Sequence, residues 1–357
     1  EGALYTNGQD VTVRHYFSSY GPPSRTLHFG SSNIYIGQST NNCAYFYMFP
    51  EPFNFDAGTS TIYMYSPSYC SNSSFIGGNK TYYNLVGVVP TQVDNDNNFH
   101  SATFLKSARI TGNNHYDILT FTAGQLYELG GGSTQTINPG GAFNGNGTCM
   151  DFVTIVSQSP ENAAQIEKTT GIAALSYVVL QDIHAIGGAT FSTVNSADLG
   201  NNLGWTFLPS TPRNLYWVGG GGDWNDATHW SLSSGGVGGE CIPTPFDNVF
   251  FDQNAGFVLP SEQVNLNVPV AFCQNMNWTG VLNLPDLTGA SQNKLFIFGS
   301  LKFVPDMAFT FNGEVHFMAH TTGKTITSAG KEFLHSAIFD GAGGGWTLLD
   351  AFYVNLY

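Results

Sequence analysis

Short runs in which apolar and polar residues alternate, each closed by Gly, Pro, Asn or Ser, constrain this chain more than any other feature. Asn33-Ile-Tyr-Ile36 and Ser60-Thr-Ile-Tyr-Met-Tyr65 are examples. A period of two places the apolar side chains on one face of a strand, and such a short strand is not stable alone. The runs must therefore stack, so that their apolar faces join in one shared core.

Similar segments recur along the whole length at varying intervals, as in Phe55-Asp-Ala-Gly58 and Phe121-Thr-Ala-Gly124. Loose recurrence is typical of a β-solenoid, whose rungs vary in length at their turns. We predict an all-β chain of elongated, parallel β-helix (solenoid)-like blocks with Gly- and Asn-rich turns. A two-sheet sandwich is the alternative. Residues 160–168 have a local helical pattern, but the β-rich stretch 171–183 follows, and we interpret them as a loop entering a strand.

The composition argues against disorder and against several classes of partner. The 357 residues include 42 Gly, 28 Phe and 17 Tyr, but only 11 Lys plus Arg against 25 Asp plus Glu, for a net charge of −14. Such a chain can bury ample apolar surface. Because no basic run occurs, we expect no nucleic-acid partner, and because no apolar run is long enough, no membrane insertion.

Three tryptophans, Trp217, Trp224 and Trp230, lie within 14 residues, with Gly219–Gly222 between the first two. Gly and Asn oppose a helix, so the rings are expected on short strands and turns. Together with Cys241-Ile-Pro-Thr-Pro-Phe-Asp-Asn-Val-Phe-Phe-Asp252, this tryptophan-rich segment resembles one that opens a recurring module in giant cell-surface adhesins of gliding Bacteroidetes, which the type IX secretion system exports.

The resemblance implies two β-solenoid blocks. In that family a run like Gly200-Asn-Asn-Leu-Gly-Trp205 ends one block, which places the boundary near Thr211-Pro-Arg213. The first block then spans 1–212, and the second spans 213–357 and is truncated at its C-terminal end. Both chain ends are expected to be cuts from something longer.

The family also implies a function, which is structural and adhesive rather than enzymatic. The expected place is extracellular, at the cell surface and attached to the outer membrane, in gliding motility or attachment. The expected partners are neighbouring blocks of the same giant chain, surface polysaccharide or substratum, and the type IX secretion and gliding machinery. We further hypothesise that Trp217, Trp224 and Trp230 seal the junction between the two blocks. If the indoles instead lie exposed on one flat face, they form a sugar-stacking platform.

The five cysteines are odd in number and form no CxxC motif. An outer-surface location would allow disulfides. The favoured pair is Cys241 with Cys273, because both lie in the module that the tryptophans open. Cys43 with Cys70 is the next pair, about one rung apart, which leaves Cys149 free. Five buried thiols acting as small apolar residues are the alternative.

Two acidic segments are candidates for chemistry, since a β-helix lyase or hydrolase needs clustered carboxylates. Asp94-Asn-Asp-Asn-Asn98 alternates oxygen ligands like the start of a calcium loop, so calcium at Asp94 and Asp96 is weighed against a solvated turn. Asp223-Trp-Asn-Asp226 is expected to cap turns. His316 and His320 would lie about 13 Å apart on a strand, too far to share a metal. We expect no organic cofactor and no catalytic residue.

Tyrosines offer a second function, because exposed aromatic rings stack on sugars in carbohydrate-binding modules. Tyr63 and Tyr65 would share one face of a strand, opposite Ile62 and Met64. The sequence does not tell which face is outward, and core filling is the alternative for most of the group. The candidates are Tyr45, Tyr47, Tyr63, Tyr65, Tyr82 and Tyr83.

Overall fold

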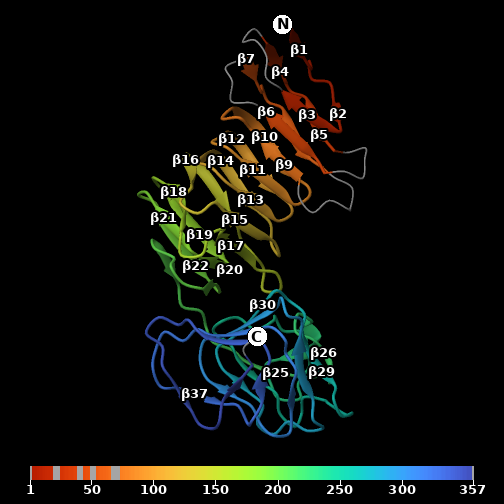
Figure 1. The fold of residues 1–357 in the computed structure, drawn as a ribbon, viewed down its shortest axis with the longest axis vertical. Coiled ribbons are helices and arrows are strands. Elements are labelled where there is room, and N and C mark those ends of the chain that lie inside the picture. Colours follow the sequence, from red (N-terminus) through yellow and green to blue (C-terminus); the bar gives the residue numbers. More distant parts are fainter. Residues whose placement is uncertain (1, 19–24, 38–42, 49–53, 66–72, 356–357) are drawn as a thin grey trace. The chain divides into compact units, whose positions relative to one another are not determined.

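The alternating runs form short strands that stack in parallel, one rung upon the next (Figure 1). The computed structural model describes residues 2–18, 25–37, 43–48, 54–65 and 73–355. Strands make up 48% of it, and no α-helix occurs among these residues. Because successive rungs pair in parallel, the β-helix prediction is confirmed and the antiparallel sandwich is excluded.

The chain divides into two units. Unit 1 comprises Glu1–Val194 and Asp198–Leu208, and unit 2 comprises Asn195–Ala197 and Pro209–Tyr357. The division at Leu208 lies close to the boundary that the sequence places at Thr211–Arg213.

Unit 1 contains two long sheets of nine strands each. Sheet I consists, in order, of β2 (Val11–Val13), β5 (Asn33–Ile36), β8 (Thr61–Met64), β10 (Thr81–Gly87), β12 (Asn98–Phe104), β14 (Asn114–Phe121), β16 (Thr134–Asn144), β18 (Ala164–Lys168) and β21 (Ile183–Ile186). Sheet II consists of β3 (His15–Ser18), β6 (Tyr45–Met48), β9 (Ser73–Ile76), β11 (Thr91–Asp94), β13 (Ala108–Ile110), β15 (Leu126–Leu129), β17 (Val153–Ser157), β20 (Val178–Gln181) and β23 (Ala197–Asp198).

Two short sheets of three strands each complete unit 1. Sheet III contains β1 (Ala3–Tyr5), β4 (Thr26–His28) and β7 (Asn54–Asp56), and sheet IV contains β19 (Ile172–Ser176), β22 (Thr190–Val194) and β24 (Trp205–Phe207). The interpretation of 160–168 as a loop is wrong for most of the segment, because Ala164–Lys168 is itself strand β18, paired with β16 and β21.

The core of unit 1 is a column in which each rung places like residues above like residues. Phe46 stacks on Phe75 with ring centroids 4.8 Å apart, and Phe99 stacks on Tyr116 at 5.5 Å. Parallel pairing in register produces these stacks, because the same position of each rung points inward. The alternation in the sequence therefore becomes a continuous apolar interior.

A ladder of side-chain amides runs through the same column where the rungs turn. Asn97, Asn114 and Gln135 are fully buried. Asn97 Nδ2 donates to Asn114 Oδ1 at 3.1 Å, and Asn114 Nδ2 donates to Gln135 Oε1 at 3.2 Å. Gln135 Nε2 in turn donates to the Gly112 carbonyl at 2.9 Å. Buried amides are tolerated here because each one bonds to a neighbouring rung.

Unit 2 is also a parallel stack, with three main sheets of seven, four and four strands. Sheet V contains β27 (Trp230–Ser231), β25 (Asn214–Trp217), β28 (Asn248–Phe250), β31 (Met276–Asn277), β34 (Leu301–Lys302), β37 (Lys324–Thr327) and β40 (Trp346–Leu348). Sheet VI contains β26 (Gly222–Asp223), β29 (Gln263–Leu266), β32 (Asp286–Gly289) and β35 (Ala308–Phe309). Sheet VII contains β30 (Val270–Cys273), β33 (Lys294–Ile297), β36 (Glu314–Phe317) and β39 (Ser336–Phe339).

The remaining elements of unit 2 are a two-stranded sheet and a single turn of 3-10 helix. The small sheet pairs β38 (Glu332–Phe333) with β41 (Tyr353–Val354), and the helical turn is η1 (Ala227–His229). Only β25 and β27, within the described pairs of sheet V, run antiparallel. Over the residues described, no helix is long and apolar enough to cross a membrane.

Candidate functional site

A groove of about 400 Å³ opens on the outer surface of unit 1, between the last strand of sheet III and four strands of sheet I, β10, β12, β14 and β16. Its floor is aromatic and its walls are polar. The floor consists of Phe55, Tyr82 and Phe99, and the walls include Asp56, Thr81, Tyr83, Asn98, His100, Asp117 and Asn138.

The groove exists because the rungs shorten at this point. Ile34 of β5 pairs with Ile62 of β8, a step of 28 residues that leaves room for a third strand, β7. Phe99 of β12 pairs with Tyr116 of β14, a step of only 17 residues. Sheet III therefore ends at β7, and the next rungs leave a hollow beside it.

One wall is a row of four side chains from neighbouring strands of sheet I. Tyr83 stacks on His100 with ring centroids 4.3 Å apart. His100 Nδ1 lies 2.9 Å from Asp117 Oδ2, and Asn138 Nδ2 donates to Asp117 Oδ1 at 2.8 Å. Each of the four therefore supports the next, and the row presents one aromatic face with several hydrogen-bonding atoms.

A second row repeats this arrangement on sheet III. Tyr5 stacks on His28 at 4.8 Å, and His28 Nδ1 lies 3.1 Å from Asp56 Oδ2. Gly58 adopts a φ of +57° there, and its amide donates to Asp56 Oδ1 at 2.9 Å. Asp56 thus belongs both to this row and to the opposite wall of the groove.

Both groove carboxylates are held in the ionised form. Hydrogen bonds from Asn138 and then His100 lower the pKa of Asp117. The amide of Gly58 and then the ring of His28 lower the pKa of Asp56. Ionised carboxylates are acceptors only, so the two residues suit the hydroxyl groups of a bound ligand.

Five of the six tyrosines singled out in the sequence reach the surface, and only Tyr82 is a core residue. Tyr45 and Tyr65 are 41% and 38% exposed. Tyr63 is half-buried and stacks on Tyr35 of the preceding rung at 5.0 Å, opposite the buried Ile62 and Met64. Core filling, the alternative for most of this group, is thus wrong for all but Tyr82, whose hydroxyl donates to the Gly77 carbonyl at 2.7 Å.

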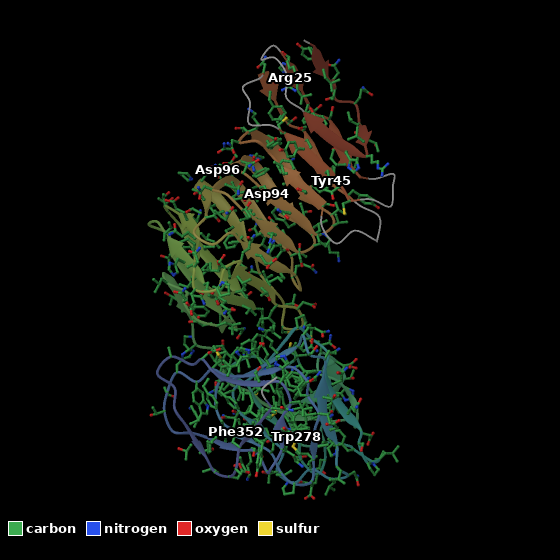
Figure 2. The ribbon with its side chains drawn as sticks, viewed as in Figure 1. Arg25, Tyr45, Asp94, Asp96, Trp278 and Phe352 are labelled. Carbon is green, nitrogen blue, oxygen red and sulfur yellow. The ribbon has the colours of Figure 1, made fainter. Side chains whose placement is uncertain are left out.

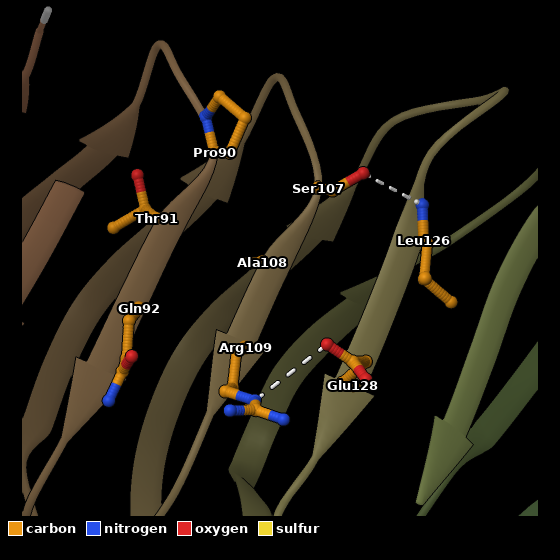
Figure 3. Close-up of a pocket in the computed structure, with 8 residues that line it drawn as sticks. All are labelled: Pro90, Thr91, Gln92, Ser107, Ala108, Arg109, Leu126 and Glu128. Atoms are coloured by element: carbon orange, nitrogen blue, oxygen red, sulfur yellow. Dashed lines mark hydrogen bonds and ion pairs between the residues drawn. The ribbon is translucent and has the colours of Figure 1, made fainter. Parts of the chain in front are cut away.

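A second hollow, of about 260 Å³, lies on the outer face of sheet II over β11, β13 and β15 (Figure 3). Arg109 Nε lies 3.7 Å from Glu128 Oε2 across it, and the Leu126 amide donates to Ser107 Oγ at 3.2 Å. None of the described residues that line this hollow is aromatic. It therefore lacks the stacking surface that the groove has.

The three clustered tryptophans of the sequence lie inside unit 2. Trp217, Trp224 and Trp230 are fully buried, so they are not an exposed sugar-stacking platform. Trp230 packs edge-on against Trp217 at 5.1 Å and against Trp224 at 4.8 Å. Phe251 joins the cluster and stacks on Trp278 at 3.9 Å (Trp278 is labelled in Figure 2). The proposed sealing of a junction between blocks stays a prediction.

Asp94 and Asp96, labelled in Figure 2, belong to a turn that the ladder residue Asn97 closes, since Asn97 Nδ2 donates to the Asp94 carbonyl at 2.9 Å. Thr111 Oγ1 donates to Asp94 Oδ1 at 2.6 Å, and the Asn113 amide donates to Asp96 Oδ1 at 2.6 Å. Among the described residues no cluster of three or more His, Cys, Asp or Glu is placed to hold a metal. These contacts favour the turn over the calcium site.

The acidic residues beside the tryptophans also serve turns. Asp226 is the N-cap of η1, and its carboxylate accepts from the Thr228 amide at 2.9 Å. Asp223 Oδ1 accepts from Asn265 Nδ2 at 2.7 Å, across neighbouring strands of sheet VI. The capping prediction is therefore confirmed for Asp226, whereas the Asp223 side chain links two strands.

His316 and His320 lie in different surroundings, since His316 is buried in a strand and His320 is exposed beyond its end. His316 belongs to β36, and its Nε2 and Nδ1 lie 3.0 Å from Glu314 Oε2 and 3.1 Å from Asp340 Oδ2. His320 follows the strand and is exposed. His316 is therefore the centre of a carboxylate pair, which the spacing of the two histidines did not indicate.

The favoured disulfide is wrong. Cys241 is disulfide-bonded, whereas Cys273 is a free, fully buried thiol, so the two do not pair. Cys149, expected to be free, is disulfide-bonded, as is Cys43. Cys70 lies outside the described residues. Sharing a module with Cys241 does not make Cys273 its partner, because Cys273 is the last residue of β30 and is buried in the core, where burial raises its pKa.

The rows of the groove were missed because their members are far apart in sequence. A signal was present, since Tyr83, His100 and Asp117 recur at the 17-residue step of these rungs. No protein-family model, curated protein or solved structure matches this chain.

Proposed function

We propose that this chain is an extracellular structural and adhesive segment of a large cell-surface protein, of the kind that serves gliding motility or attachment. The observation that carries the proposal is the groove, whose aromatic and hydrogen-bonding row suits a polysaccharide. The Tyr83–His100 stack offers an apolar face to a sugar ring, and Asp56, Asp117 and Asn138 offer partners to its hydroxyls.

The architecture supports the structural part of the proposal. Each rung bonds through its backbone to the rungs before and after it, so stability is distributed along the stack. The disulfide bonds of Cys43, Cys149 and Cys241 support an oxidising location outside the cell. The expected partners remain neighbouring blocks of the parent chain, the export and gliding machinery, and polysaccharide or substratum.

The groove itself is tested by affinity electrophoresis of the full chain in gels that contain xylan, mannan or a soluble β-glucan. We expect retardation by at least one of these polymers, and its loss in Tyr83→Ala and His100→Ala. Tyr45→Ala is the matched control, because Tyr45 is exposed on sheet II, away from the groove. Equal loss in the control, or no retardation of the wild type by any polymer, contradicts the proposal.

The location is tested separately with an antibody raised against the chain. We expect it to label intact, unpermeabilised cells of the source organism. Labelling that requires permeabilisation contradicts an extracellular segment.

Hydrolysis of a bound polysaccharide is the second candidate, because two carboxylates, Asp56 and Asp117, line one groove. A glycosidase needs one carboxyl group that stays protonated to act as the acid. Both groove carboxylates have lowered pKa values instead, which favours binding over cleavage. Release of reducing ends from a retarding polymer, abolished by Asp117→Asn, would reverse this preference.

A further inference from the structure

Lys168 occupies a position in unit 1 where an apolar residue is expected. It is the last residue of β18, on the same face of the strand as the fully buried Ala164 and Ile166. Its register partner in β16 is the core residue Ile137. Lys168 is only 5% exposed, although lysine is rarely buried without a charged partner.

The amine of Lys168 is incompletely satisfied by the protein. Its Nζ donates to the carbonyl of Gly141 at 2.6 Å. Within the described residues no carboxylate forms an ion pair with it. An ammonium group has three N–H donors, and a buried cation is costly unless an opposite charge accompanies it. The described residues therefore supply no anionic partner for the Lys168 ammonium group.

A hollow of about 510 Å³ lies where the lysine is placed. One side is the segment 140–144 at the end of β16, and the other is 170–174, which enters β19. Phe143, and Ile172 with 71% exposure, give it apolar walls. Gly140 and Gly171 adopt φ values of +80° and +85°, which glycine tolerates, so no side chains block the space there.

The hollow and the groove share one irregular segment of β16. The register between β14 and β16 shifts after the pair Tyr116–Ile137, and the pairing resumes at Ile118–Ala142. The intervening residues form a bulge, with Asn138 lining the groove and Gly140 and Gly141 lining the hollow. A polysaccharide that crosses this bulge would contact both.

We infer that the Lys168 hollow binds the carboxylate of an acidic sugar residue, a hexuronate, with Nζ as its charged partner. A single ammonium matches a monoanion, and the apolar walls suit the face of the sugar ring. The ionised Asp56 and Asp117 of the groove repel a carboxylate, so a neutral sugar lies there. This inference deepens the proposed function, on which it rests, by specifying a mixed neutral and acidic polysaccharide.

The test is calorimetric titration of the full chain with glucuronate, with glucose and inorganic sulfate as comparisons. We expect glucuronate to bind more tightly than glucose, and Lys168→Met to weaken glucuronate binding at least tenfold while leaving any response to glucose unchanged. Lys106→Met is the control, since Lys106 is exposed on unit 1. Unchanged glucuronate affinity in Lys168→Met overturns the inference, as does sulfate binding as tight as glucuronate.

A second measurement needs no variant and remains informative if Lys168→Met does not fold. Amine acetylation of the wild type, mapped by mass spectrometry, should show Lys168 protected by glucuronate and Lys106 unprotected. Equal acetylation of Lys168 with and without glucuronate overturns the inference. Tyr83→Ala separates the two proposals, because it should abolish retardation by neutral polymers but leave glucuronate affinity unchanged.

Discussion

The two units use the same strand chemistry but stabilise their stacks differently. Unit 1 has rungs as short as 17 residues, fully buried amides and rings stacked in register. Unit 2 begins with rungs of 34 and 27 residues, and it has an amide ladder that is only partly buried and a compact tryptophan cluster. Unit 2 also stacks rings in register, as Phe317 does on Phe339 at 4.8 Å. A dense cluster near the start of a stack can thus supplement the contacts that repeat at each rung.

The amide ladder of unit 2 makes the contrast concrete. Asn275 Nδ2 donates to Asn248 Oδ1 at 2.6 Å, and Asn248 Nδ2 donates to Asn214 Oδ1 at 2.9 Å. Asn214 is exposed and the other two are half-buried, whereas Asn97 and Asn114 are fully enclosed. If a ladder amide is removed, water can take its place as the hydrogen-bond partner of the remaining amides in unit 2, but not in unit 1.

The largest expected effect is the loss of one indole from the cluster. Trp230→Ala should lower the free energy of unfolding of unit 2 by about 3–5 kcal/mol, because it leaves a cavity among buried rings. Mass spectrometry of thiol labelling at Cys273 measures this, since that thiol is buried in unit 2. Labelling should accelerate roughly a hundredfold or more. Leu232→Ala, at a 55% exposed position, should change little, and a similar rate in both variants would contradict the cluster's role.

Alkaline pH should act next most strongly, and mainly on unit 1. Burial raises the pKa values of Tyr82, Tyr116 and Tyr127. A raised pKa contributes stability that is complete below the unfolded value of about 10 and is lost as the pH rises above it, by about 1.4 kcal/mol per pH unit for each group. Phenolate absorbance should rise cooperatively as unit 1 unfolds.

In unit 2 the buried Cys273 also has a raised pKa, but it is a single group, whereas unit 1 also has Tyr16 and Tyr35 with raised pKa values besides the three named above. Circular dichroism of Cys273→Ala should therefore show the same early alkaline transition from unit 1. Disappearance of that transition in the variant would assign it to unit 2.

The amide ladders should differ by a smaller amount. Asn114→Ala leaves the Asn97 amide and the Gln135 side chain short of a buried partner, at a cost of about 1–3 kcal/mol. Asn275→Ala should cost less, because its neighbours reach water. Urea denaturation of both variants measures the difference, and equal costs would show that burial of the ladder does not matter.

The smallest effect is expected at acid pH. The lowered pKa values of Asp117 in unit 1 and Glu314 in unit 2 contribute stability above their ordinary titration range, and it is lost as the pH falls. Burial raises the pKa of Glu314, but hydrogen bonds from Lys294 and His316 outweigh it. Asp117 is the more exposed of the two. Glu314→Gln should therefore reduce the pH dependence of the urea unfolding midpoint at acid pH more than Asp117→Asn does. The reverse order would contradict this.

The fold was predictable because alternation is a local property. Runs such as Asn33–Ile36 and Thr61–Met64 show which residues face inward, and stacking then follows from the need to bury one face. The acidic turn at Asp226 was predictable for the same reason, since capping is decided within a few residues.

The candidate site was only partly predictable, because it depends on register. Tyr83 was a candidate, but His100 and Asp117 become its neighbours only through strand pairing. The end of sheet III, which opens the groove, depends on rung length and not on any motif. The predicted Cys241–Cys273 disulfide was wrong for a similar reason, because proximity along the chain does not decide which side chains point toward each other.

The 17-residue step has a consequence for how such a chain changes in length. From Tyr82 to Tyr116 each rung repeats the same inward and outward positions, so a duplicated copy of residues 99–115 would insert as one further layer. A copy one residue shorter would turn every following side chain of that strand to the wrong face. Growth and loss are therefore restricted to whole layers. Gene duplication can lengthen the coil without redesigning its interior, and each added layer brings its own outward row for new contacts.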